Sequence, residues 1–243
     1  MPQNVSLLTS RRSYEFLPDA IRLTVLTIPE HREKITEAFR FEVAGVGTPQ
    51  PTFAEPVRTI PPGLAFDMGS ISVDGELFAI RFIHVEARRI VVDVAGPSRI
   101  IEYVYERLRT LLVDMTAPDG QPAVGEHERV LDYSEYVARF DFAPESFVNP
   151  MLVALVRQTG MQMEHGQELA LVPSLYIVEQ ASEEVSRGSV VEPLSTMFQF
   201  SVRAGSKPGD RMYFSAAPVD SDKHSALLAA IDEALRTSTG HGP

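Results

Sequence analysis

The sequence of 243 residues contains no cysteine. Without this residue the chain can form no disulfide bond, no thiolate nucleophile and no cysteine-ligated zinc or iron–sulfur site. It also lacks any run of about 18 apolar residues that could cross a membrane as a helix. The opening residues MPQNVSLLTSRRSYEF lack the apolar core of a signal peptide. We therefore expect a cytoplasmic protein that does not associate with membranes.

Basic residues are scarce relative to acidic ones. The chain has 22 Lys and Arg against 33 Asp and Glu, a net charge of −11. Residues 1–113 hold 13 basic and 14 acidic residues (−1), whereas residues 114–243 hold 9 and 19 (−10). Because an acidic surface is repelled by the phosphate backbone, nucleic-acid binding is not expected. The acidic surplus either keeps a surface solvated or faces a basic protein partner.

Sequence patterns in the first half of the chain predict both strands and helices. Residues 20–28 alternate apolar and polar positions, which predicts a half-buried strand. Pro29 is a suitable first residue for a helix over 29–43. Asp74-Gly75 between two β-type stretches is typical of a hairpin turn. The other expected elements are an exposed, proline-rich connection at 44–62, strands at 63–73, 75–87 and 88–96, and a helix at 97–113.

The second half repeats this order of elements. A strand is expected at 135–145, a helix at 149–160, strands at 168–180, 196–205 and 211–217, and a helix at 220–238. Pro144-Glu145 corresponds to Pro29-Glu30, and the tripeptide Leu-Arg-Thr occurs at both 108–110 and 235–237. The sequence therefore predicts an α+β protein with an internal duplication.

The expected organisation is two tandem β-α-β-β-β-α units, each a mainly antiparallel sheet with helices on one face. In element order alone, this arrangement resembles the duplicated TATA-binding-protein-like and multidrug-sensor-like architectures, in which two such units form one curved sheet. No sequence motif of either family is present, so no family is assigned. The expected boundaries are a leader at 1–19, a first unit at 20–113, a linker at 114–130, a second, acidic unit at 131–236 and a flexible tail at 237–243.

His84 is the first residue considered for chemistry. It is either a base or ligand that acts with Glu86, or a histidine packed at the end of an apolar stripe, and we prefer the second reading. Counting by twos along the strand places Phe78, Ile80 and Phe82 on the face of His84, and Ala79, Arg81, Ile83 and Val85 on the other.

Two acidic clusters could attract a metal ion, but their spacing matches no standard ligand signature. Both are interpreted as solvated charge. No Gly-x-Ser-x-Gly motif occurs, and the loop AGVGTPQ lacks the remaining residues of a phosphate or dinucleotide site. We therefore assign no catalytic, cofactor-binding or metal-binding residue and expect no cofactor. The clusters are Glu164, His165 and Glu168, and Glu126, His127, Glu128, Asp132 and Glu135. On the helix at 97–113, Glu106 and Arg107 are expected to form ordinary surface pairs, and Tyr103 is expected to cover an edge of the core.

Three functions remain open. The favoured one is a non-enzymatic interaction or assembly protein that acts through its sheet edges and its first unit. The alternatives are a small-molecule sensor with a pocket between the units and, less favoured, a hydrolase or lyase. Since the acidic half opposes self-association, residues 1–113 are expected to supply most of the interface in a homodimer or a complex with another protein.

Overall fold

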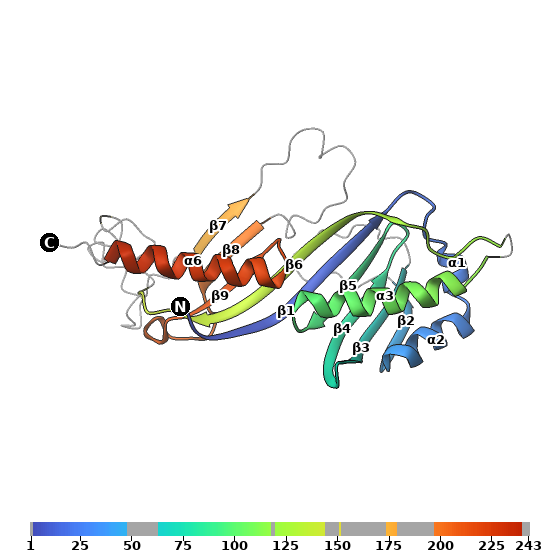
Figure 1. The fold of residues 1–243 in the computed structure, drawn as a ribbon, viewed down its shortest axis with the longest axis horizontal. Coiled ribbons are helices and arrows are strands. Elements are labelled where there is room, and N and C mark those ends of the chain that lie inside the picture. Colours follow the sequence, from blue (N-terminus) through green and yellow to red (C-terminus); the bar gives the residue numbers. More distant parts are fainter. Residues whose placement is uncertain are drawn as a thin grey trace, which may run out of the picture. The chain divides into compact units, whose positions relative to one another are not determined.

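A computed structural model describes residues 2–47, 63–117, 120–143, 151, 174–178 and 197–239. These residues form an α+β fold with an open antiparallel sheet of nine strands in the order β2-β3-β4-β5-β1-β6-β9-β8-β7 (Figure 1). The expected fold class and antiparallel pairing are thereby confirmed. The strands are β1 (Gln3–Phe16), β2 (Val43–Gly47), β3 (Gly63–Val73), β4 (Glu76–Val85), β5 (Arg89–Ala95), β6 (His127–Arg139), β7 (Ser174–Val178), β8 (Met197–Val202) and β9 (Met212–Ala217).

Four α-helices accompany the sheet in the described part of the chain. They are α1 (Leu23–Leu26), α2 (Pro29–Phe39), α3 (Ser98–Asp114) and α6 (Ser221–Thr239), and a short 3-10 turn covers Pro208–Asp210. None of the helices in these described ranges has the length and apolar character needed to cross a membrane.

The chain divides into two compact units. The N-terminal unit is Thr9–Asp132, and the C-terminal unit combines Met1–Leu8 with Tyr133–Pro243. Strands β1 and β6 each contribute residues to both units.

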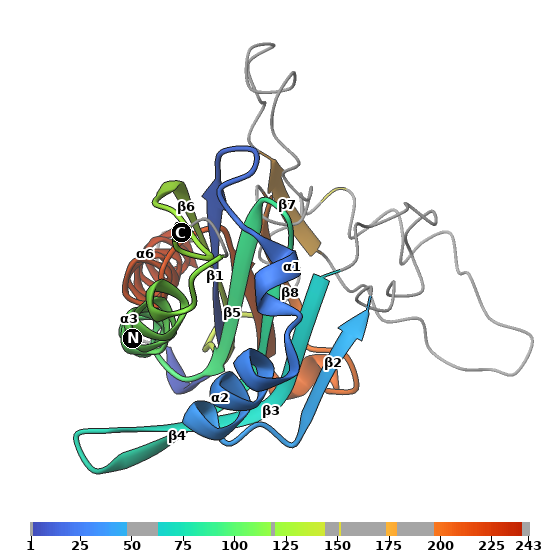
Figure 2. The ribbon, with the colours of Figure 1, turned by 90° about the vertical axis from the view of Figure 1, so that its right-hand side faces the viewer.

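In the N-terminal unit, α1, α2 and α3 pack on one face of the strands (Figures 1 and 2). The apolar stripe predicted for α3 is buried, since Ile101, Val104 and Leu108 have no exposed surface. These side chains share one core with alternate residues of the strands, among them Ile90 and Val92 of β5. The strand faces that contact the helices are therefore apolar, as the two-residue period requires.

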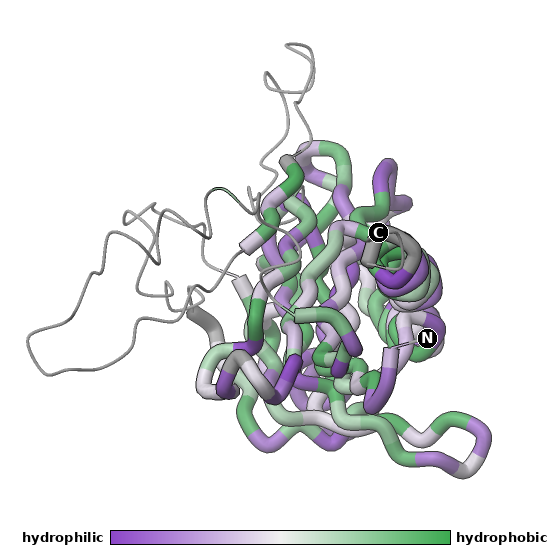
Figure 3. Tube along the Cα trace, turned by 90° about the vertical axis from the view of Figure 1, so that its left-hand side faces the viewer, coloured by the Kyte–Doolittle hydropathy of each residue, from purple (hydrophilic) through white to green (hydrophobic). Residues whose placement is uncertain are grey.

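The C-terminal unit has its own core between α6 and strands β6, β8 and β9. Leu228 of α6 is buried there with a cluster of aromatic rings. The rings of Phe140, Phe200 and Tyr213 have centroids 5.0–5.4 Å apart, a spacing at which aromatic pairs attract. Hydrophobic and hydrophilic positions alternate along the strands of the sheet (Figure 3).

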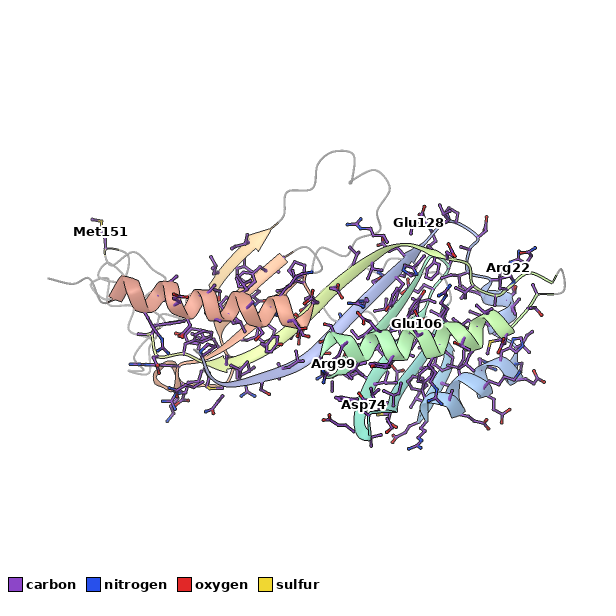
Figure 4. All side chains as sticks on the ribbon, viewed as in Figure 1. Arg22, Asp74, Arg99, Glu106, Glu128 and Met151 are labelled. Atoms are coloured by element: carbon purple, nitrogen blue, oxygen red, sulfur yellow. The ribbon has the colours of Figure 1, made fainter. Side chains whose placement is uncertain are left out.

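The β3–β4 hairpin confirms the turn predicted from Asp74-Gly75, which lies at its tip (Figure 4). Asp74 and Gly75 have positive φ angles of 52° and 83°, as expected where both central residues of a two-residue turn are left-handed. The strands predicted at 63–73, 75–87 and 88–96 and the helices predicted at 97–113 and 220–238 are confirmed within a few residues.

The strand predicted at 20–28 is wrong. Residues 23–26 form α1, and only Ile21 makes an isolated bridge, with Val124. The amides of Val25 and Leu26 donate to the carbonyl of Arg22, so local turn bonding replaces sheet pairing.

Instead, residues 3–16 of the expected leader form the longest strand, β1. The polar composition of this segment predicts a leader instead of a strand. Its two arginines are paired within the fold, because Arg11 and Arg12 bind Asp93 and Asp132.

The segment predicted as a linker, 114–130, contributes to the core of the N-terminal unit. Met115 and Ala123 are buried, and the amide of Ala123 donates to the carbonyl of Met115 over 2.8 Å. The strand predicted at 135–145 begins earlier, as β6 at His127. The helix predicted at 149–160 lies, apart from Met151, outside the described residues.

Candidate functional site

A β-bulge at Arg81 determines which side chains of β4 face the helices. In the β4–β5 register Ile80 pairs with Val94, but Phe82 pairs with Asp93, so Arg81 is an extra residue. The face assignment obtained by counting by twos is therefore wrong beyond Ile80. Phe78 and Ile80 share the core with Ile83 and Val85, whereas Phe82 and His84 lie on the opposite face.

None of the described helices of the N-terminal unit covers this opposite face, because α1, α2 and α3 pack on the other one. We call it the open face. Its central residues come from β1, β3, β4 and β5: the polar Thr9, Arg11, Asp67, Arg81, His84 and Asp93, and the aromatic Phe82.

Asp93 anchors the open face. Its side chain is only 1% exposed, and Arg11, directly opposite in the β1–β5 register, donates from Nε to its Oδ2 over 2.9 Å. The hydroxyl of Thr9 binds the other carboxylate oxygen, Oδ1. Nε of Arg81 lies 4.0 Å from that same oxygen. The buried charge is thus held by a hydroxyl and by two guanidinium groups, as a buried carboxylate requires.

Phe82 is packed between Arg11 and His84. The guanidinium carbon of Arg11 lies 5.2 Å from the centre of the Phe82 ring, within the range of a cation–π contact. The rings of Phe82 and His84 are stacked with centroids 4.2 Å apart. These three side chains form a continuous row across the open face.

His84 closes the row beside Asp67, with 3.5 Å between its Nε2 and Oδ1 of Asp67. Burial lowers the pKa of His84 below its ordinary 6.5, although the carboxylate of Asp67 acts in the opposite direction. The ring is therefore mostly neutral at neutral pH and stacks as an aromatic group. Among the described residues it contacts no serine or threonine hydroxyl that it could activate. Glu86, its suggested partner, binds Arg89 instead, with Arg89 Nε 2.7 Å from Oε2.

A second histidine has the contacts of a catalytic pair but not the accessibility. Nδ1 of His224 lies 2.9 Å from Oγ of Ser134, and Nε2 lies 2.8 Å from Oγ of Ser215. Oγ of Ser134 and Oγ of Ser215 also lie 2.9 and 3.1 Å from the carbonyl oxygens of Val219 and Gln199. Two hydroxyls and a neutral ring supply three protons, so they form three of these four contacts as hydrogen bonds at any one time. His224 and Ser134 are 0% exposed and Ser215 is 2% exposed. No substrate reaches these atoms, so the group joins β6, β9 and α6 and is structural.

The predicted acidic cluster around His127 is resolved into separate pairs. Nδ1 of His127 lies 3.1 Å from the hydroxyl of Tyr105, whose own ring stacks on Tyr14. Asp132 accepts from Nε of Arg12 over 2.6 Å, and Glu135 accepts from a tyrosine hydroxyl. No group of three described acidic or histidine side chains is placed to hold a metal ion. Glu126 and Glu128 are exposed, and Glu164, His165 and Glu168 lie outside the described residues.

The helix residues singled out from the sequence have ordinary surroundings. Tyr103 is 52% exposed, and Glu106 pairs with Arg109 at 3.9 Å. Arg107 lies over the ring of Phe39, 5.7 Å from its centre. These contacts are typical of a helix surface.

Sequence reasoning missed Asp93 and Arg11, which are central to the open face. One signal was available: a single acidic residue stands in the otherwise apolar stretch IVVDVA of β5. An unpaired carboxylate is costly to bury, so this pattern predicts a cationic partner from elsewhere. The identity of that partner depends on the pairing of β1 with β5, which the sequence does not reveal.

Comparison with known proteins adds no relative. No protein-family model matches the chain, and no curated protein matches it. The geometry of the described residues therefore carries the functional proposal.

Proposed function

We propose that this protein is a non-enzymatic interaction protein that binds a protein partner through the open face of its N-terminal unit. The observation that carries the proposal is the row formed by Arg11, Phe82 and His84 and anchored by the buried Asp93. Arginine and aromatic side chains are the types most enriched among residues that dominate binding energy.

The rigidity of this row supports the proposal. Its side chains stand on β1 and β4, on either side of β5, and Arg11 is held both by Asp93 of β5 and by the ring of Phe82. A side chain that is already ordered loses little conformational entropy when a partner binds. The side chains of the row are therefore already ordered in the unbound protein.

Strands β3 and β4 also carry exposed apolar residues. Leu77 of β4 is 64% exposed and Met68 of β3 is 55% exposed. Leu77 and Ala79 alternate with the buried Phe78, so they stand on the same side of β4 as the open face. Apolar surface beside charged residues is the composition of a protein interface.

The proposal is tested by photo-crosslinking in cells. A benzophenone amino acid replaces Leu77, beside the open face, or Tyr103, an exposed residue of α3 with 52% exposure. We expect one discrete adduct from position 77 and none from position 103, and loss of that adduct when Arg81→Glu is added. Equal adducts from both positions, or none from either, would contradict the proposal.

Sedimentation velocity of the purified chain then identifies the kind of partner. A concentration-dependent dimer that Arg81→Glu dissociates identifies a second copy of this chain, while a strict monomer together with the adduct identifies another protein. In either case residues 1–113 are expected to supply the interface.

We also propose that the two halves are copies of one α+β plan. In support, β1 pairs with β5 and β6 pairs with β9, each antiparallel, and each of the two later strands is followed by a long helix. The neighbour order β3-β4-β5 also corresponds to β7-β8-β9. An experimental structure whose halves place corresponding strands in different order would reject the duplication.

A further inference from the structure

We infer that the partner presents an acidic peptide segment to Arg11 and Arg81; this rests on the proposed function of the open face. The side chains of these two arginines are 36% and 48% exposed, whereas that of their common counter-ion, Asp93, is 1% exposed. The open face therefore displays two guanidinium groups and hides the carboxylate that holds them.

The bulge in β4 contributes directly to this display. It inserts Arg81 beside Phe82, and so brings a second guanidinium to the level of Asp93 on β5. Bulges re-aim side chains in this way next to functional sites. Guanidinium groups bind carboxylates through paired, charge-assisted hydrogen bonds, which makes acidic side chains their natural partners.

The other titratable groups of the open face limit where an acidic segment can lie. Asp67, which is 40% exposed, pairs with Phe82 in the β3–β4 register and so lies on the side of Phe82 away from β5 and Arg11. Its negative charge repels a carboxylate, so the acidic residues of the partner are directed toward the arginines. The uncharged ring of His84 and that of Phe82 offer apolar contact between these two ends.

A short acidic peptide fits this surface better than a nucleic acid does. A nucleic acid would place phosphate charges along its whole length against a chain whose net charge is −11. An acidic peptide needs only the two guanidinium groups and the neighbouring apolar residues.

The experiment measures binding of fluorescent probes to the purified full chain by anisotropy. The probes are an extended peptide of alternating Glu and Leu, the same peptide with Gln for each Glu, and a single-stranded oligonucleotide of equal length. Arg81→Gln is the test variant, because it leaves the bond between Arg11 and Asp93 in place. Arg99→Gln is the matched control, since Arg99 is an exposed residue of α3, on the helix-covered side (Figure 4).

We expect the Glu peptide to bind, with a dissociation constant that rises about tenfold in Arg81→Gln and is unchanged in Arg99→Gln. Raising the salt concentration from about 50 to 500 mM should weaken binding of the Glu peptide to the wild-type chain, because charges near the surface are screened. The inference is overturned if the Gln peptide binds equally well, if both variants lose affinity alike, or if the oligonucleotide binds more tightly. Should the crosslink from position 77 persist while the Glu peptide fails to bind, the interface stands and only its acidic partner is rejected.

Discussion

Lowering the pH from 7 to 5 should destabilise the C-terminal unit through His224. This residue, near the start of α6, is fully buried between the hydroxyls of Ser134 and Ser215. Burial lowers the pKa of His224 from 6.5 to about 4. Below pH 6.5 the unfolded chain therefore binds a proton that the folded unit takes up only near pH 4. The free energy of unfolding falls as the pH falls through this window.

The two pKa values determine the size of the effect. A histidine that titrates at 6.5 when unfolded and at about 4 when folded lowers the free energy of unfolding by at most about 3 kcal/mol. At pH 5 the loss is about 2 kcal/mol, because there the unfolded side chain is mostly charged and the folded one is mostly neutral.

The nearby carboxyl of Asp220 titrates outside this window. Burial acts to raise its pKa, but hydrogen bonds and charge from Lys223 outweigh burial and lower it below 3.8. The stability that Asp220 contributes is therefore lost only at lower pH, as the carboxylate is protonated in the folded state. Measurements between pH 7 and 5 isolate the contribution of His224 from that of this neighbour.

Hydrogen exchange of peptides from β9, followed by mass spectrometry, measures the local opening free energy of this unit. We compare the wild-type chain with His224→Gln, which keeps a polar side chain without the titration, and with His31→Gln, a control on α2 in the other unit. Wild type and control should lose about 2 kcal/mol between pH 7 and 5, and His224→Gln much less. The same pH dependence in His224→Gln as in wild type would refute the reasoning. So would a folded-state pKa of 6.5 or more in an NMR titration of the His224 ring.

Two further predictions concern the packing of the N-terminal unit. The hydroxyl of Ser10 is buried and has no hydrogen-bond partner among the described residues, so Ser10→Ala should raise the free energy of unfolding by about 1 kcal/mol in urea denaturation; an unchanged or lower value would contradict this. At Gly69 a Cβ atom would stand 2.5 Å from Cε1 of Phe41 and 2.9 Å from the carbonyl oxygen of Phe39. Gly69→Ala should therefore lower the free energy of unfolding by about 1–3 kcal/mol in the same urea denaturation. Gly45→Ala is its control, because a Cβ there meets nothing within 4 Å; equal effects at both glycines would refute the steric account.

The elements that the sequence predicts well are those with local signals. The helix α3 carries its buried stripe in its own spacing, and the β3–β4 turn is encoded in the two adjacent residues Asp74 and Gly75. Strand β1 has no such signal. Its arginines, Arg11 and Arg12, resemble solvated charges until partners 82 and 120 residues away in the sequence are brought beside them. A reading confined to neighbouring residues assigns such a segment to a leader.

The sequence does not predict the open face, for a related reason. Strict alternation along β4 would place Phe82 and His84 with Phe78 and Ile80, in the core that the helices cover. One extra residue in that strand reverses the assignment, because a shift of one position moves every later side chain to the other face. No glycine or proline marks Arg81, so the bulge is visible only in the pairing of β4 with β5. The same insertion brings Phe82 opposite Asp93 and Arg81 beside it. The bulge and the proposed interaction surface are therefore one feature of the fold.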